Sequence, residues 1–261
     1  MGRRIFDLYD HAKDIYAEAS DYLGYDVLQK TMESTFEEVS DTRFAQPVLL
    51  VSGYMVYRYY VEVMRSEIPP SYLGGHSMGE ITALLCGDAI SFKDALFLAE
   101  KRGELMARVT AERGGTMAAV KDLNTRIVER ICAEVCTSSA YVGVASLNTD
   151  MHTVITGNTE AVSKAGEACS DAGGIFIPLN ITVASHCPFM DGIVGEFYEA
   201  AASVQYRTPV CPVYSCLRGQ LYRGTEEMAA GLSQQMVAPV QWKNIIEDMK
   251  RRDVGVFLEA G

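Results

Sequence analysis

Apolar side chains recur every three or four residues through much of the first 110 positions, which predicts helices separated by short apolar strands. Residues 46–64 (QPVLLVSGYMVYRYYVEVM) are apolar on nearly every side, which is typical of a buried helix. Residues 91–109 carry apolar positions at helical spacing behind Ser91, a residue suited to cap a helix. Between these two helices, residues 71–75 (SYLGG) are expected to form a strand.

The pattern changes near Gly114, where strand-like segments begin to alternate with helical ones. Strands are predicted in residues 115–120, 141–148, 152–158 and 175–182, and helices in residues 123–136 and 159–174. This strand–helix–strand–strand–helix–strand order is the ferredoxin-like pattern. After residue 184 helical patterning resumes, with strand-like segments at residues 212–216 (PVYSC) and 254–261 (VGVFLEAG).

These elements predict an α/β fold in two parts. A small ferredoxin-like (βαββαβ) subdomain, residues 111–183, is inserted into a large α/β-hydrolase-like subdomain formed by residues 1–110 and 184–261. The sequence has no internal repeat and no low-complexity linker. Because sites tend to lie between domains, side chains near the junction are the first candidates for function.

Composition narrows the class of protein. The net charge of −11 argues against general nucleic-acid binding, although it is compatible with a local basic patch for an acidic partner. No run of about 18 apolar residues is present, so no transmembrane helix is expected, and the first residues lack the apolar core of a signal peptide. Seven cysteines without a C-x-x-C pair indicate neither a disulfide framework nor a zinc site, which fits a cytoplasmic protein.

Residues 75–79, Gly-His-Ser-Met-Gly, fit the pattern G-x-S-x-G, which places a nucleophile at a sharp strand-to-helix turn. Ser77 would then lie at the N-terminus of the following helix, where free amide N–H groups and the helix dipole favour negative charge. A serine at this place can also be a plain helix cap, so the motif alone leaves both interpretations open.

A serine nucleophile needs a base, and histidine is the usual one at neutral pH. His11 belongs to a polar N-terminal helix, and His152 to the turn between two strands of the small subdomain. The side chain of His76 is expected to point away from its neighbour Ser77. His186 follows directly after the small subdomain, so it is the candidate base, in a dyad with no fixed acid between serine and histidine.

Arg102 is the third candidate, on the helix that follows the nucleophile helix. It is either a surface arginine of the segment EKRGELM or a buried guanidinium that holds a carboxylate with two hydrogen bonds. Helical periodicity does not choose between these two interpretations.

The segment GGHSMGEITALLCGDAISFKDALFLAEKRGELM, residues 74–106, resembles the core of the malonyl-CoA:acyl carrier protein transacylases and of polyketide synthase acyltransferase domains. In overall character the chain resembles the free-standing, trans-acting acyltransferases of that family. Further similar segments are QPVLL at Gln46, GGTMAAV at Gly114, SLNT at Ser146, ITG at Ile155, SHCPFM at Ser185, APVQW at Ala238 and VFLEAG at Val256.

The resemblance assigns a role to each candidate. It implies that Ser77 carries the acyl group as an ester and that His186 is its base. It implies that Arg102 binds the free carboxylate of a malonyl group and that Gln46 lines the site. Met78 would supply a backbone N–H to the oxyanion hole.

Two further positions follow from the same resemblance. His76 is expected to be a substrate-binding residue, like its neighbour Met78. The histidine base is expected to be oriented by a backbone carbonyl in the segment VAPVQW, near Ala238, so no acidic side chain is needed there.

The reaction implied is transfer of a malonyl group from malonyl-CoA, through a Ser77 ester, to the phosphopantetheine thiol of an acyl carrier protein in polyketide or fatty-acid biosynthesis. The resemblance implies no bound cofactor or metal, no nucleic-acid or membrane partner, and a cytoplasmic monomer. Residues 183–186 (Val-Ala-Ser-His) match three of four positions of a methylmalonyl-associated pattern, but bacterial transacylases with a similar Ser-His use malonyl, which we therefore favour.

Three alternatives remain at this point. An acyl hydrolase that clears stalled carriers would use the same dyad with water, but Arg102 argues against it, because a broad hydrolase gains nothing from a buried cation. An unrelated α/β-hydrolase would need an acid between serine and histidine. The third alternative is a truncated, inactive carrier-binding module. The family has an N-terminal strand with a GQGSQ turn, which supplies a second oxyanion N–H, and it continues past VFLEAG. A chain cut at both ends would lack these parts.

Overall fold

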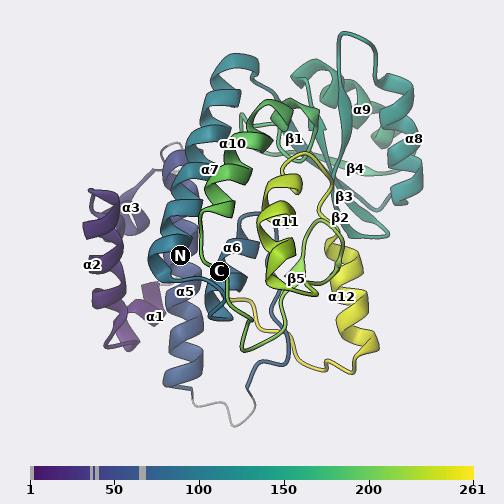
Figure 1. Cartoon of the computed structure of the whole chain (residues 1–261). Coiled ribbons are helices and arrows are strands. Elements are labelled where there is room, and N and C mark those ends of the chain that lie inside the picture. Colours follow the sequence, from purple (N-terminus) through teal and green to yellow (C-terminus); the bar gives the residue numbers. More distant parts are fainter. Residues whose placement is uncertain (1–2, 36–37, 39–40, 65–68) are drawn as a thin grey trace.

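The computed structural model describes residues 3–35, 38, 41–64 and 69–261 (Figure 1). Its first part is helical, as the three- to four-residue spacing predicts. The helices are α1 (Arg3–Leu8), α2 (Ala12–Leu23), α3 (Val27–Glu33), α5 (Thr42–Glu62), α6 (Gly79–Cys86) and α7 (Phe92–Arg113). Helix α7 begins where the sequence predicts, because the Ser91 side chain accepts a hydrogen bond from the backbone N–H of Asp94.

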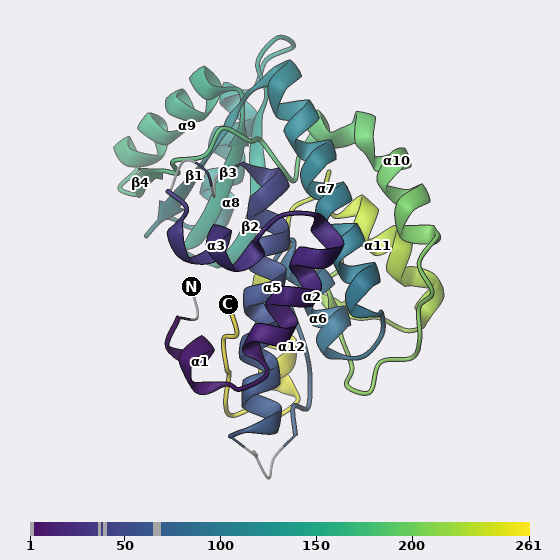
Figure 2. The same ribbon diagram turned by 90° about the vertical axis from the view of Figure 1, so that its left-hand side faces the viewer.

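The long helices α5 and α7 run side by side, and a glycine makes their close approach possible (Figures 1 and 2). A Cβ atom on Gly103 would lie 2.4 Å from the carbonyl oxygen of Thr42, so a larger residue cannot occupy this crossing. The Thr42 hydroxyl in turn donates to the Gly103 carbonyl over 2.8 Å. This crossing holds the middle of α7, where Arg102 lies, against the start of α5, where Gln46 lies.

Helix α6 is the most enclosed helix of this part, because apolar side chains surround it on both sides. Ile81, Leu84 and Leu85, predicted to line one helical face, are all buried in the main core. That core also includes Leu50 of α5 and Leu98 of α7, and the helix that follows Ser77 packs against both long helices.

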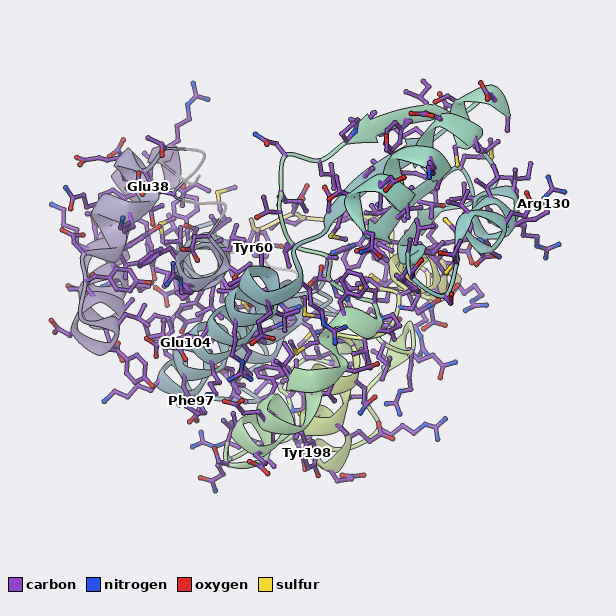
Figure 3. All side chains as sticks on the ribbon, turned by 90° about the horizontal axis from the view of Figure 1, so that it is seen from above. Glu38, Tyr60, Phe97, Glu104, Arg130 and Tyr198 are labelled. Carbon is purple, nitrogen blue, oxygen red and sulfur yellow. The ribbon has the colours of Figure 1, made fainter. Side chains whose placement is uncertain are left out.

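A second core lies in a four-stranded antiparallel sheet of order β2-β3-β1-β4. Its strands are β1 (Thr116–Lys121), β2 (Val142–Thr149), β3 (His152–Gly157) and β4 (Ile175–Pro178), and its helices are α8 (Thr125–Val135) and α9 (Thr159–Asp171). The chain order is the strand–helix–strand–strand–helix–strand order predicted from the sequence. Viewed from above, Arg130 of α8 and Glu38 lie at opposite ends of the molecule (Figure 3).

After the small sheet the chain returns to the first part and completes it. The elements are the 3₁₀ turns Pro188–Met190 and Thr225–Glu227, helices α10 (Asp191–Ala202), α11 (Met228–Gln234) and α12 (Trp242–Arg251), and the short strands β5 (Tyr214–Ser215) and β6 (Gln220–Leu221). A single parallel bridge joins Ser146 of β2 to Val240. This bridge ties the edge of the small sheet to the segment that leads into α12.

The predicted strand at residues 212–216 contains β5, but the other two predicted strands of the large part differ from the structure. Residues 71–75 contribute only one parallel bridge, between Leu73 and Val213, and residues 254–261 form no strand. Val256 and Phe257 are exposed there, because no described segment offers this stretch a ladder of hydrogen bonds along its length. The extended sheet expected of an α/β-hydrolase-like subdomain is therefore not seen among the described residues, where helices dominate the large part.

Candidate active site

Ser77 lies at a tight turn directly before α6, as the spacing of the G-x-S-x-G motif predicts. Its φ of 55° is in the left-handed region, which is uncommon for a residue with a side chain. A Cβ atom on Gly75 would lie 1.8 Å from the carbonyl oxygen of Gly79, so the turn requires glycine at this position. Backbone hydrogen bonds from Gly79 to His76 and from Glu80 to Ser77 close the turn.

The hydroxyl of Ser77 lies 2.8 Å from Nε2 of His186. The other ring nitrogen, Nδ1, is 2.7 Å from the backbone carbonyl oxygen of Gln235. A carbonyl oxygen only accepts hydrogen bonds, so Nδ1 carries the proton and Nε2 is free to accept from the serine. His186 also has a left-handed backbone, with a φ of 60°, so both members of the pair lie in strained conformations.

The imidazole of His186 is 3% exposed, and its surroundings favour the neutral form. Burial, reinforced by the nearby positive charge of Arg102, lowers the pKa of His186 to about 3. The ring is therefore uncharged at neutral pH, which is the state that a general base requires.

Arg102 is 2% exposed, so the surface interpretation is wrong and the guanidinium belongs to the site. Its Nη2 donates to Ser77 Oγ over 2.9 Å and its Nη1 donates to Gln46 Oε1, also over 2.9 Å. Its Nε is buried and has no partner among the described residues. Burial lowers the pKa of Arg102 to about 10, which leaves the group charged at neutral pH.

Gln46 and His76 reach the site from different sides. The Gln46 side chain is buried, and its Nε2 donates to the sulfur of Met106 over 3.2 Å, so its Oε1 is held toward Arg102. His76 points away from Ser77, as expected: its Nε2 lies 2.9 Å from the hydroxyl of Ser146 on β2. Burial lowers the pKa of His76, so the ring is neutral. Through its hydrogen bond to Ser146 it connects the serine turn to the small sheet.

The histidines that the sequence sets aside lie elsewhere. His11 is exposed next to Asp14, and His152 begins β3 of the small sheet. Met78 is the residue directly before α6, so its backbone N–H is one of the amides that a helix leaves without an intrahelical partner. Its role in an oxyanion hole, which the family resemblance implies, stays a prediction.

Sequence reasoning missed Gln235, whose carbonyl lies just before the segment VAPVQW that was predicted to orient the base. A backbone carbonyl acts without any particular side chain, so no residue pattern marks it. The carbonyl at hydrogen-bond distance from His186 is therefore that of Gln235, three residues before the predicted Ala238.

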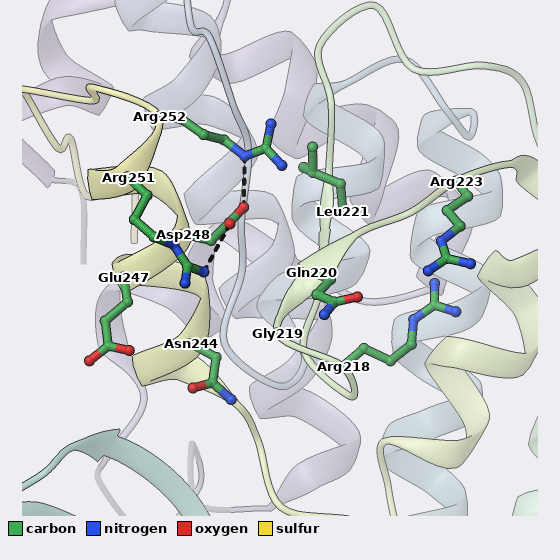
Figure 4. Close-up of a pocket in the computed structure, with 10 residues that line it drawn as sticks. All are labelled: Arg218, Gly219, Gln220, Leu221, Arg223, Asn244, Glu247, Asp248, Arg251 and Arg252. Carbon is green, nitrogen blue, oxygen red and sulfur yellow. Dashed lines mark hydrogen bonds and ion pairs between the residues drawn. The ribbon is translucent and has the colours of Figure 1, made fainter.

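A surface cavity of about 450 Å³ lies apart from these residues, between the β5–β6 hairpin and α12 (Figure 4). It is lined by Arg218, Gly219, Gln220, Leu221, Arg223, Asn244, Glu247, Asp248, Arg251 and Arg252. Arg251 and Arg252 pair with Asp248, and Arg218 pairs with Glu227, so most of its positive charge is balanced. Among the described residues, no hydrogen bond or ion pair joins its lining to Ser77, His186 or Arg102.

Two general properties complete the picture of the described residues. They include no group of three or more His, Cys, Asp or Glu side chains placed to hold a metal ion. No helix among them combines the length and apolarity that crossing a bilayer requires.

The arrangement around Ser77 is that of a serine–histidine acyl-transfer site, with a backbone carbonyl in place of the usual acid and a fixed cation beside the nucleophile. Comparison with known sequences agrees with this class. The chain belongs to the acyl transferase domain family, whose profile matches residues 1–261.

Relatives of known name are similar over nearly the whole chain. The malonyl CoA-acyl carrier protein transacylase of Escherichia coli strain K12 is 32% identical over 254 residues, which are 97% of this chain and 81% of the relative. The transacylase of the same name from Haemophilus influenzae is 30% identical over 249 residues, 95% of this chain and 79% of the relative.

Solved structures share the fold. A malonyl-transacylase in complex with a type II PKS acyl-carrier protein superposes with a TM-score of 0.94 at 32% identity, covering 100% of this chain and 84% of that chain. The malonyl CoA-acyl carrier protein transacylase of Coxiella burnetii superposes with a TM-score of 0.92 at 29% identity, covering 97% of this chain and 80% of that chain. The chain thus has the mixed α/β fold of these transacylases.

Proposed function

We propose that this acyltransferase moves a malonyl group from malonyl-CoA, through an ester on Ser77, to the phosphopantetheine thiol of an acyl carrier protein. The observation that carries the proposal is the position of Ser77 Oγ, 2.8 Å from a neutral base and 2.9 Å from a buried guanidinium. The named relatives, malonyl CoA-acyl carrier protein transacylases, support the choice of substrate and partner.

In the first half-reaction His186 Nε2 takes the proton of Ser77 as the serine oxygen attacks the thioester carbonyl. The Met78 N–H stabilises the oxyanion, and the proton on His186 passes to the departing CoA thiolate. In the second half-reaction His186 takes the proton of the carrier thiol, whose sulfur attacks the ester carbonyl. The bond to Ser77 Oγ then breaks, and His186 returns the proton to the departing serine oxygen. The carbonyl of Gln235 keeps the ring aligned throughout, because Nδ1 retains its proton.

Arg102 gives the site its preference for an acyl group that ends in a carboxylate. Its buried charge needs a counterion, and the unpartnered Nε together with Nη2 offers a two-pronged face of the kind that binds carboxylates. Gln46 holds the opposite edge of the guanidinium and so fixes its plane. This geometry favours transfer of malonyl over general hydrolysis, where a buried cation has no use.

The wider architecture follows the same proposal. We place the site between a large subdomain, residues 1–110 and 184–261, and a small ferredoxin-like subdomain, residues 111–183. The hydrogen bond between His76 and Ser146 and the bridge from Ser146 to Val240 support this division, since they join the two parts next to Ser77. We also expect a cytoplasmic monomer that needs no bound cofactor.

Intact-mass measurement after incubation with malonyl-CoA tests the proposal. Wild-type protein should gain one malonyl unit, and Ser77→Ala should gain none, because the hydroxyl of Ser77 lies beside the base His186. Ser146 also lies beside a histidine, His76, but it is buried and donates its hydroxyl proton to Asn148. Ser138→Ala, which changes an exposed serine of the small subdomain, is the matched control and should acylate like wild type. Labelling that persists in Ser77→Ala, or a wild-type protein that takes up no acyl group, contradicts the assignment.

A further inference from the structure

Glu80 is a buried carboxyl that the mechanism above does not use. It lies in the first turn of α6, three residues after Ser77, and its side chain is 0% exposed. Buried carboxyl groups are rare unless they are well hydrogen-bonded, so the hydrogen-bond partners of Glu80 indicate its role in the structure.

The partners of Glu80 are all hydrogen-bond donors. Its Oε1 accepts from the hydroxyl of Tyr222, and its Oε2 accepts from Nε2 of Gln235 over 2.8 Å. The backbone of Cys216 also hydrogen-bonds this carboxyl and lowers its pKa. Each of these groups can donate to a carboxylate, and the Tyr222 hydroxyl can also accept the proton of a neutral carboxyl.

Gln235 is the residue on which this network converges. Its side-chain Nε2 donates both to Glu80 and to the backbone carbonyl of Ser77, the latter over 3.1 Å. Its Oε1 is buried without a partner, which is unfavourable. Rotating the amide by 180° would be worse, because it would place this oxygen against the carboxyl oxygen of Glu80. Its backbone carbonyl holds Nδ1 of His186 at 2.7 Å.

We propose that Glu80 is a positioning residue for the reaction: by holding the side chain of Gln235 against the serine turn, it fixes the carbonyl that aligns His186 with Ser77. The role rests on the proposed serine–histidine chemistry. It explains why a polar pair, Glu80 and Gln235, occupies the enclosed space between α6 and the end of α11. The shared contact with the Ser77 carbonyl couples the base and the nucleophile to one anchor.

Burial and hydrogen bonding act on the charge of Glu80 in opposite directions. Burial raises the pKa of Glu80 to about 7, while the hydrogen bond from Tyr222, those from Cys216 and the charge of Arg102 oppose that rise. A neutral glutamine has the same shape but only one acceptor oxygen, so it cannot accept from Tyr222 and Gln235 on separate oxygens. Glu80→Gln therefore loosens the anchor with little change in volume.

The test is a double-mutant cycle between Glu80→Gln and Gln235→Ala, read out as kcat and KM for malonyl-CoA. Gln235→Ala keeps the backbone carbonyl but removes the amide that Glu80 holds. Each single variant should lower kcat about 10–100-fold, the loss found when residues that orient metal-binding histidines are replaced. KM should stay within about twofold, because Arg102 keeps its contacts. The double variant should have a kcat no lower than that of the less active single variant, because both changes disrupt the same contact between Glu80 and Gln235.

A matched control separates positioning from stability. Tyr214→Phe removes another hydrogen bond between a buried tyrosine and a carboxylate, that of Tyr214 with the partly buried Asp248, which forms no hydrogen bond or ion pair with Ser77, His186 or Gln235 among the described residues. It should lower the unfolding temperature as Glu80→Gln does but leave kcat unchanged. A structural role for Glu80 predicts instead that kcat follows stability in all variants.

Reactivity of Ser77 toward a fluorophosphonate gives a second readout that needs no malonyl group. The rate of labelling should fall in Glu80→Gln and in Gln235→Ala in parallel with kcat, because alignment of the base activates the serine for any electrophile. Unchanged kcat in Glu80→Gln, or losses that multiply in the double variant, would overturn the inference. If Glu80→Gln does not fold, Gln235→Ala alone decides, and its full activity overturns the inference too. A wild type that labels with fluorophosphonate but not with malonyl-CoA counts against the proposed substrate and not against the role of Glu80.

Discussion

Replacing Arg102 with alanine should separate malonyl transfer from acetyl transfer. Because Arg102 is 2% exposed, a carboxylate bound to it lies away from water, and removal of the cation leaves that anion buried and unpaired. The cost is roughly 3–5 kcal/mol, which corresponds to a loss of about 10²–10⁴-fold in kcat/KM for malonyl-CoA. Acetyl-CoA brings no carboxylate to desolvate, so its rate should stay the same or rise.

The assay is the single-turnover rate of acyl-enzyme formation, followed by rapid quench and intact mass, with malonyl-CoA and acetyl-CoA in parallel. The informative quantity is the ratio of the two rates, because discrimination is a difference between two affinities. Arg108→Ala is the control: Arg108 lies on the same helix but pairs with Glu196 at the surface, and its loss should change neither rate.

Two results test whether Arg102 selects malonyl over acetyl groups. Arg102→Lys should recover only part of the malonyl rate, because an ammonium group does not reproduce the two-pronged contact of a guanidinium. Malonyl and acetyl rates that fall together in a folded Arg102→Ala protein, as judged by circular dichroism and thermal unfolding, would refute the assignment of Arg102 as the selector.

Further predictions follow from the same geometry. His186→Ala should lower the rate of acyl-enzyme formation about 10²–10⁴-fold, whereas His11→Ala and His152→Ala should leave it unchanged; a larger loss in His152→Ala would move the site. Because burial lowers the pKa of His186 to about 3, the unfolded chain binds more protons than the folded one below the ordinary histidine pKa. The free energy of unfolding, followed by urea titration, should therefore fall as pH drops from about 6.5 toward 3, and less so in His186→Ala; equal pH dependence in both proteins would contradict the buried neutral ring. Gly75→Ala should prevent acylation, because its Cβ would lie 1.8 Å from the Gly79 carbonyl oxygen, and a variant that acylates normally would show that the turn can relax. Malonyl-CoA should have a higher kcat/KM than methylmalonyl-CoA, and the reverse order would favour the other interpretation of residues 183–186.

Local patterns in the sequence determined much of the fold. The spacing of apolar residues predicts α6, α7 and the strand–helix order of the small sheet, because the period of a helix or strand is written in consecutive side chains. The glycines around Ser77 predict the turn for the same reason, since the contact that excludes a Cβ at Gly75 is made within the motif itself.

The sequence was less informative where a strand depends on distant partners. Residues 254–261 have the composition of a buried strand, yet they form none, because a ladder requires a neighbouring segment along the whole length. The predicted strand at residues 71–75 is reduced to a single bridge between Leu73 and Val213 for the same reason.

Only the tertiary structure decided how the site is assembled. The periodicity of α7 leaves open whether Arg102 faces solvent, and the answer comes from the crossing of α5 and α7 at Gly103, which buries the guanidinium against Gln46 and Ser77. The carbonyl of Gln235 carries no side-chain signal, since every residue has one. Its role, and that of Glu80 behind it, arises because the fold brings residues more than 150 positions apart in the chain within hydrogen-bonding distance, which no local pattern encodes.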